Sequence, residues 1–143
     1  MDSILRHQKA SQQLKLFLAQ HLQLENYIFW FECEKFRNQT SAFADRILCN
    51  FITSSAASQV NINHVMRQKI ENAITKNEYI SIHSFDEAQA EIYKLLVQNN
   101  YEAFIKSDIC AHYIESKIHE REMGSLEAID EMNEEPAAGT ENI

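Results

Sequence analysis

Six histidines, three cysteines and 21 acidic residues are the side chains of this 143-residue chain that could do chemistry. His112, Glu115 and His119 share one face of a helix by their spacing, which makes them the best candidates for metal ligands. A metal site needs a converging ligand from a second element, and none is evident, so solvated polar side chains are the simpler interpretation. The Glu-x-x-His motif, which a di-iron bundle needs on two helices, does not occur. We therefore expect no metal and no cofactor.

Nucleophilic and acid–base catalysis find no better support. Neighbouring carboxylates such as Glu32 and Glu34 point to different faces of a helix, so they do not form an acid–base pair. Cys33, Cys49 and Cys110 are odd in number and form no Cys-x-x-Cys pair, which favours buried, reduced thiols. The first 123 residues contain no glycine, which excludes a phosphate-binding glycine loop and a nucleophile elbow there. The sequence therefore predicts that the chain is not an enzyme.

The net charge of −8 is concentrated at one end of the chain. Residues 120–143 carry eight acids and one arginine, whereas residues 1–119 are close to neutral. We expect residues 1–119 to form one domain and residues 120–143, an acidic extension containing both glycines and the one proline, to be disordered. There is no Lys/Arg cluster for nucleic acid and no apolar run long enough for membrane insertion. The expected location is the cytoplasm.

Apolar spacing predicts an all-α fold, and the first 123 residues hold neither glycine nor proline. The segment from 25 to 37 is apolar almost all round, so we expect it to be the central helix, with Trp30 buried. The helices predicted from apolar stripes cover about 11–22, 25–37, 42–52, 65–74, 84–98 and 108–118.

Several residues are placed to begin or end these helices. Asn63 is expected to cap the helix over 65–74. Ser84 and Glu87 are expected to form a capping box for the next helix. Asn99 and Asn100 tolerate turn conformations, so that helix should bend or stop there before a short helical turn.

Two groups of polar residues stand at helix ends beside apolar anchors. Gln23-Leu24-Glu25-Asn26 leads into the central helix, and Gln98-Asn99-Asn100 follows the long helix that begins near residue 84. Ordinary capping and turn formation explain both groups, and a binding surface is the alternative. The residues alone leave both interpretations open.

Four sequence blocks resemble the regulator of G-protein signalling (RGS) domain family. Residues 24–36 read Leu-Glu-Asn-Tyr-Ile-Phe-Trp-Phe-Glu-Cys-Glu-Lys-Phe, similar to the family signature Glu-Asn-x-x-Phe-Trp-x-x-Cys-Glu-x-Phe. Residues 60–63, 84–89 and 101–107 resemble three further family blocks, in family order. The resemblance implies about nine helices, with a central antiparallel four-helix bundle and a second lobe built from the chain ends.

The resemblance also implies a function. RGS domains bind the GTP-loaded α subunit of a heterotrimeric G protein and speed its GTP hydrolysis by stabilising the switch regions, without a catalytic group of their own. Asn99 and Ala103 stand where the family has an acidic and a basic residue, so part of the contact surface is altered. The contact positions implied by the family fall on Glu25, Asn26, Asn72, Leu95, Asn99, Asn100 and Ala103.

Two hypotheses follow from this altered surface. The leading one is a GTPase-activating RGS domain that acts as a monomer and is recruited by its partner to the inner face of the plasma membrane. The alternative is an RGS-homology scaffold module that binds another protein or peptide without an effect on GTP turnover.

Overall fold

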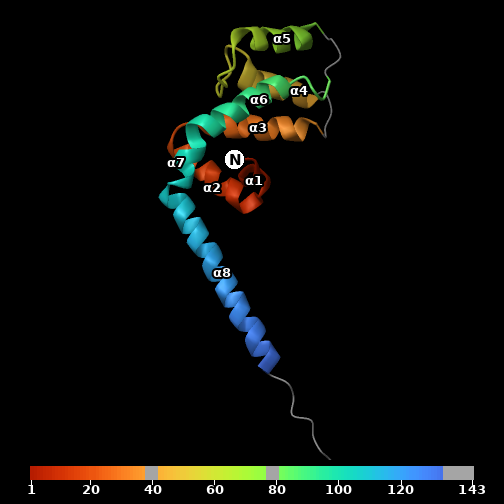
Figure 1. Cartoon of the computed structure of the whole chain (residues 1–143). Coiled ribbons are helices and arrows are strands. Elements are labelled where there is room, and N and C mark those ends of the chain that lie inside the picture. Colours follow the sequence, from red (N-terminus) through yellow and green to blue (C-terminus); the bar gives the residue numbers. More distant parts are fainter. Residues whose placement is uncertain (38–41, 77–80, 134–143) are drawn as a thin grey trace, which may run out of the picture.

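The computed structural model describes residues 1–37, 42–76 and 81–133, and all regular structure in these ranges is helical (Figure 1). This confirms the expected all-α class. Two helices change their winding along their length, because α4 continues into a π-helical segment, η1, and α6 passes through a second one, η2, into α7. The elements are α1 (Asp2–Arg6), α2 (Gln8–Gln20), α3 (Leu24–Phe36), α4 (Ala42–Ile47), η1 (Leu48–Ile52), α5 (His64–Thr75), α6 (Asp86–Leu95), η2 (Leu96–Tyr101), α7 (Glu102–Ile105) and α8 (Asp108–Asn133).

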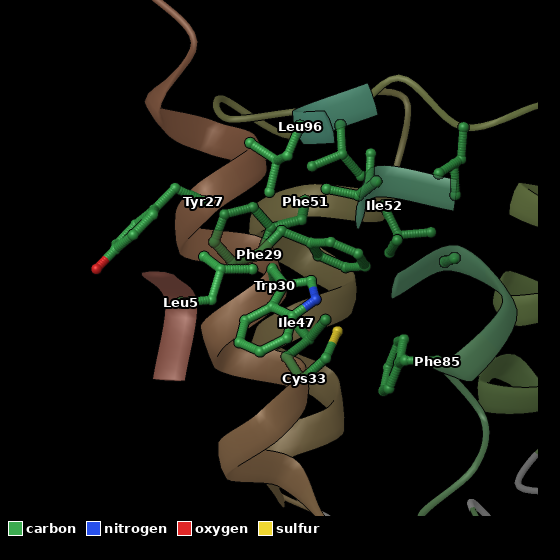
Figure 2. Close-up of a cluster of buried hydrophobic side chains, with 14 of the residues drawn as sticks. Leu5, Tyr27, Phe29, Trp30, Cys33, Ile47, Phe51, Ile52, Phe85 and Leu96 are labelled. Carbon is green, nitrogen blue, oxygen red and sulfur yellow. The ribbon is translucent and has the colours of Figure 1, made fainter. Parts of the chain in front are cut away.

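The central helix is α3, as expected, and it packs against α2, α4 and α6. Its buried residues Phe29, Trp30 and Cys33 belong to the cluster in Figure 2, where they gather with side chains from η1 and η2. Phe29 meets Phe51 of η1 edge to face, with ring centroids 5.7 Å apart. This geometry suits the ring quadrupoles and adds to the free energy of burying apolar area. One core therefore fixes the orientation of both ends of α3.

A second set of contacts joins the beginning of the chain to its end. Phe17 of α2 meets Phe104 of α7, with ring centroids 5.7 Å apart, and α2 also packs against α8. Tyr27 of α3 points away from the cluster of Figure 2, and its hydroxyl lies 2.7 Å from the hydroxyl of Ser11 in α2. These contacts hold α2, and hence the turn that follows it, against α3.

The buried positions of the continuous helix α6–η2–α7 recur every four residues. An α-helix turns about 100° per residue, so each four-residue step would carry the buried line about 40° around the axis. The wider winding of the π-helical segment reverses this drift and keeps the line on the core. For this reason the helix does not stop at Asn99 and Asn100, so of the two outcomes expected there, a bend or a stop, the stop is wrong. The buried line consists of Ala88, Ile92, Leu96, Asn100 and Phe104.

One of the two expected caps forms and the other does not. Asn63 caps α5, because its Oδ1 accepts a backbone N–H of the first turn at 2.8 Å. The expected capping box of α6 is wrong, since the helix begins at Asp86 and its N-cap, Phe85, makes no side-chain cap. The carboxylate of Glu87 instead binds the ammonium group of Lys69 in α5, at 3.0 Å.

The last helix is longer than the sequence predicts. We expected it to end near Ile118, but α8 continues to Asn133 and runs away from the other helices in Figure 1. Residues 121–125 are exposed, so good helix formers such as glutamate and methionine sustain this stretch without core contacts. Residues 120–133 of the acidic extension are thus helical, and residues 134–143 lie outside the described residues.

Two apolar side chains are more exposed than expected. Cys33 and Cys110 are buried as predicted, but Cys49 is exposed because it lies on the outer face of the α4–η1 helix. Leu22, expected on the apolar stripe of the helix over 11–22, is 88% exposed because α2 ends at Gln20.

Candidate partner-binding surface at the N-terminal end of α3

The turn between α2 and α3, residues 21–26, is called the α2–α3 corner below. It is a Schellman motif, in which the N–H of Leu22 bonds the carbonyl of Ala19 at 3.4 Å and the N–H of Gln23 bonds that of Leu18 at 3.0 Å. Leu22 has a φ of 54°, in the left-handed region where glycine is usual and an L side chain costs about 1–2 kcal/mol. The corner thus combines a strained backbone with an apolar side chain left open to solvent.

A hydrogen bond ties the α2–α3 corner to η2. The side-chain amide of Asn100 donates to Oε1 of Gln23 at 2.6 Å. Asn100 is 3% exposed and Asn26 is 9% exposed. Among the described residues, the Oδ1 atoms of these two asparagines are the buried side-chain acceptors that lack a hydrogen-bond partner. Such atoms are rare in native structures and call for an explanation.

A hollow of about 340 Å³ lies beside the corner. One wall is the loop between η1 and α5, which is anchored by a hydrogen bond from the N–H of Val60 to the carbonyl of Phe51 at 3.0 Å. The carbonyl of Val60 in turn accepts from the guanidinium of Arg67 at 2.9 Å. The hollow is lined by Leu22, Leu24, Glu25, Ile28, Ala57, Ser58 and Gln59.

The loop residues 57–59 were missed by the sequence analysis. Buried Val60 and Ile62 alternate with exposed Gln59 and Asn61, a pattern that marks an extended segment pinned to the core. That pattern was available in the sequence. It does not say which helix end the loop lies against, because this depends on how α4–η1 crosses α3.

Six of the predicted site residues lie on α3 or on the α6–η2–α7 helix, and the seventh, Asn72, lies on α5. Glu25 is half-buried at the rim of the hollow, and Asn26 and Asn100 are buried beside it. Asn99 and Ala103 are exposed four residues apart on the η2–α7 helix, hence on one face. Leu95 is half-buried in the last turn of α6. Asn26 and Asn100 therefore belong partly to the interior, where the sequence analysis had expected surface groups.

Asn72 does not join this group. It is exposed on α5, nine residues after the cap Asn63, which places it about 13 Å along the helix axis from the loop beside the corner. Figure 1 shows α5 leading away from the N-terminal end of α3.

The chemistry of the surface is that of binding. Its polar groups are side-chain amides and the hydroxyl of Ser58, and Glu25 is the ionisable residue that lines the hollow. Among the described residues at the corner, no nucleophile stands beside a base, so the groups present bind by hydrogen bonds and apolar contact.

The other end of α3 carries a contrasting cluster, called the Gln89 network below. The side-chain amide of Gln89 donates to the carbonyl of Trp30 at 3.0 Å and to the carboxylate of Glu34 at 2.8 Å. Its Oε1 accepts from the guanidinium of Arg37 at 2.7 Å. Arg37 also bonds Glu34 at 2.5 Å and Asp86 at 3.0 Å. The network joins the end of α3 to the start of α6.

The charges of the Gln89 network stabilise one another. Burial by itself raises the pKa of Asp86, but hydrogen bonds from Arg37 and His83 outweigh this effect and hold the pKa below its ordinary value. The hydrogen bond with Asp86 likewise raises the pKa of Arg37. Both groups are therefore charged over the physiological pH range.

Comparison with known proteins identifies the family of this helical chain. Residues 1–113 match the family model described as "Regulator of G protein signaling domain". The chain belongs to the RGS family. Human regulator of G-protein signaling 18 is 33% identical over 121 residues, which cover 81% of this chain and 50% of that protein. Human regulator of G-protein signaling 21 is 30% identical over 122 residues, 82% of this chain and 78% of that protein.

The match to the RGS family confirms the resemblance drawn from the four sequence blocks. Human regulator of G-protein signaling 1 is also 33% identical, over 113 residues that cover 76% of this chain and 53% of that protein. The chain spans about half the length of regulator of G-protein signaling 18 from human and mouse. RGS domains are regulators of G-protein signalling and not enzymes. This agrees with the prediction from the residues that the chain is not an enzyme. In the described parts of the RGS chain, no helix has the length and apolar character to span a membrane.

Proposed function

We propose that this RGS domain binds the GTP-loaded α subunit of a heterotrimeric G protein and accelerates its GTP hydrolysis. The observation that carries the proposal is the hydrogen bond from Asn100 of η2 to Gln23, which ties η2 to the α2–α3 corner that holds Glu25 and Asn26, beside an open hollow. These residues come from sequence blocks separated by more than 70 positions, and both blocks are those through which the family contacts the α subunit. Membership of the RGS family supports the same partner.

In this proposal the domain supplies no catalytic group. The α subunit carries the residues that act on GTP, and the domain binds its switch loops most tightly in the arrangement of the transition state. A hundredfold gain in rate requires about 2.7 kcal/mol more binding to the transition state than to the ground state. Two or three hydrogen bonds, each worth about 0.5–1.5 kcal/mol, are sufficient. Glu25 and the amides of the corner can provide them.

Single-turnover GTP hydrolysis by a panel of α subunits tests the proposal. The domain should raise the rate for at least one of them, and Glu25→Ala should lower that rate about tenfold, because a hydrogen bond to a charged group is worth about 1.5–3 kcal/mol. Glu115→Ala is the matched control, since Glu115 is an exposed glutamate on α8 and its loss should leave the rate unchanged.

Binding to different nucleotide states separates the activator from the scaffold. An activator binds the α subunit more tightly when it holds a transition-state mimic of the γ-phosphate than when it holds GDP alone. Equal affinity for both forms across the panel, with no change in hydrolysis rate, contradicts the proposal and leaves the scaffold module.

The two altered positions offer a gain-of-function test. Asn99→Asp together with Ala103→Arg restores the charges of the family pattern on the exposed face of η2–α7. Charge-assisted hydrogen bonds are stronger than neutral ones, so the double variant should stimulate hydrolysis more than the unaltered domain. A lower rate would show that this face is shaped for a partner other than the α subunits tested.

We further propose the family architecture and its limits for this chain. α3, α4–η1, α5 and α6–η2 form the four-helix bundle, and the chain ends form the second lobe, a division that the contacts α3–α4, α3–α6, η1–α5 and α2–α8 support. The domain covers residues 1–119 and acts as a cytoplasmic monomer recruited to the inner face of the plasma membrane, with 120–143 as an acidic extension.

Removal of residues 124–143 should change the free energy of unfolding by less than about 1 kcal/mol, measured by urea denaturation.

A further inference from the structure

Asn100 falls on a family contact position, yet its side chain is turned into the protein. It is 3% exposed, and its amide donates to Oε1 of Gln23, whereas the next side chain, Asn99, is exposed. We propose that Asn100 is a positioning residue, which acts through Gln23 to hold the α2–α3 corner in the conformation that presents Leu22 and Glu25. The residue thus serves the partner surface without forming part of it.

The winding of the η2 segment supports this role. Asn100 is the polar member of the buried line that runs from Ala88 to Phe104 at four-residue spacing. A polar group at such a position is destabilising unless it finds a hydrogen-bond partner, and the partner it finds is the side chain of Gln23, 77 residues away in the sequence. The π-helical winding turns Asn100 inward and thereby creates this link between η2 and the corner.

The corner needs such a link because its backbone is strained. Leu22 adopts a φ of 54° without being glycine, and its Schellman hydrogen bond to Ala19 is long, at 3.4 Å. A side chain other than glycine tends to leave the left-handed region, which would unwind the corner and move Leu22 and Glu25. A neutral hydrogen bond shifts such an equilibrium about two- to tenfold. That shift is comparable to the strain, so the Gln23–Asn100 bond controls how often the corner is formed.

The consequence for the partner rests on the proposed function. If the corner is only partly formed in the free domain, binding must first select the formed state, and the apparent affinity is then the intrinsic affinity multiplied by the formed fraction. Loss of the link should therefore raise the concentration of domain that half-saturates the hydrolysis rate by up to about twofold. The rate at saturation should stay unchanged, because the bound corner is fully formed.

Hydrogen exchange of the free, full chain tests the link without any partner. The backbone N–H groups of Leu22 and Gln23 report opening of the corner. Asn100→Ala and Gln23→Ala should each speed their exchange about fivefold, and the double variant should show no further increase, since both remove one interaction. Gln23→Glu keeps an acceptor at the same distance and should preserve slow exchange. Asn99→Ala removes an exposed amide one position away and is the matched control, with unchanged exchange.

Three outcomes would overturn the inference. Exchange at Leu22 and Gln23 that changes less than twofold in both single variants would show that the link does not hold the corner. Additive effects in the double variant would show that the two side chains act separately. A drop in GTP hydrolysis with Asn100→Ala but not with Gln23→Ala would make Asn100 a direct contact. If no α subunit responds to the domain at all, the proposed function fails while the exchange result still decides the inference.

Discussion

The two ends of α3 carry similar residue types but use them differently. At the C-terminal end, both the Nε2 and the Oε1 of Gln89 form hydrogen bonds. Arg37 there bonds the side chains of Glu34, Asp86 and Gln89. At the N-terminal end, the Oδ1 atoms of Asn26 and Asn100 are buried without a partner, and Leu22 is exposed in a strained conformation. The polar groups of the first end are satisfied within the chain and stabilise the fold. Those of the second end are partly unsatisfied, which costs stability in the free domain.

The largest expected effect is at Trp30, which lies between the two ends and tests whether they share one core. The side chain is 7% exposed within the cluster of Figure 2. Trp30→Ala should lower the free energy of unfolding by about 3–5 kcal/mol, because it leaves a large cavity. Urea denaturation followed by far-UV circular dichroism measures this. An unchanged midpoint would mean that α3 is not buried as described, and Trp30→Phe is the milder control.

The next effect concerns the C-terminal end of α3. Gln89→Ala should lower the free energy of unfolding by about 2–3 kcal/mol, since it leaves the buried carbonyl of Trp30 and the groups of Glu34 and Arg37 without this partner. The exposed Gln98 is the matched control, and Gln98→Ala should change stability by less than about 0.5 kcal/mol. If the two variants lower the free energy of unfolding equally in urea denaturation, the Gln89 network does not stabilise the fold, and the two ends of α3 do not differ in this respect.

Much of the fold was predictable because it follows from apolar spacing alone. The stripe of α2 from Leu14 to Leu18, the all-round apolar character of α3 and the cap Asn63 were predicted correctly. The π-helical winding of η2 was not predicted, although the four-residue spacing of mainly apolar positions from Ala88 to Phe104 is typical of a helix that includes such a segment. The capping box of α6 failed because Glu87 bonds Lys69 on another helix, a tertiary contact that no local motif encodes.

The candidate site was predictable only in part. Glu25 and Asn26 follow from the family signature, because that block keeps the same spacing in this chain. Ala57, Ser58 and Gln59 could not be found, because their position beside α3 depends on the path of α4–η1. The inward orientation of Asn100 depends on the winding of η2. The sequence therefore predicts a surface group at Asn100, whereas the structure has a buried amide that bonds Gln23.

A smaller effect, of opposite sign, is expected at the corner. Leu22→Gly should raise the free energy of unfolding by about 1 kcal/mol, because relief of the left-handed strain exceeds the added flexibility of the unfolded chain. The same variant should weaken the response of the α subunit, since the exposed apolar side chain is lost. Ala19→Gly, an exposed position inside α2, is the control and should instead lower stability by about 1 kcal/mol. A loss of stability in both variants would show that Leu22 is not strained.

The smallest expected effect on stability gives the sharpest comparison of the two ends. Asn26 lies on α3 and Gln89 faces α3 from α6, and both are buried amide residues, at 9% and 4% exposure. Asn26→Ala removes an Oδ1 that has no partner among the described residues, so it should change the free energy of unfolding by less than about 0.5 kcal/mol. It should nevertheless lower the stimulated rate of GTP hydrolysis, because Asn26 falls on a contact position implied by the RGS family and we propose that it helps to bind the switch loops. Urea denaturation and single-turnover hydrolysis on the same preparation measure both quantities. If Asn26→Ala is as destabilising as Gln89→Ala, the amide at the N-terminal end also serves the fold, and the unpaired acceptor no longer identifies the partner surface.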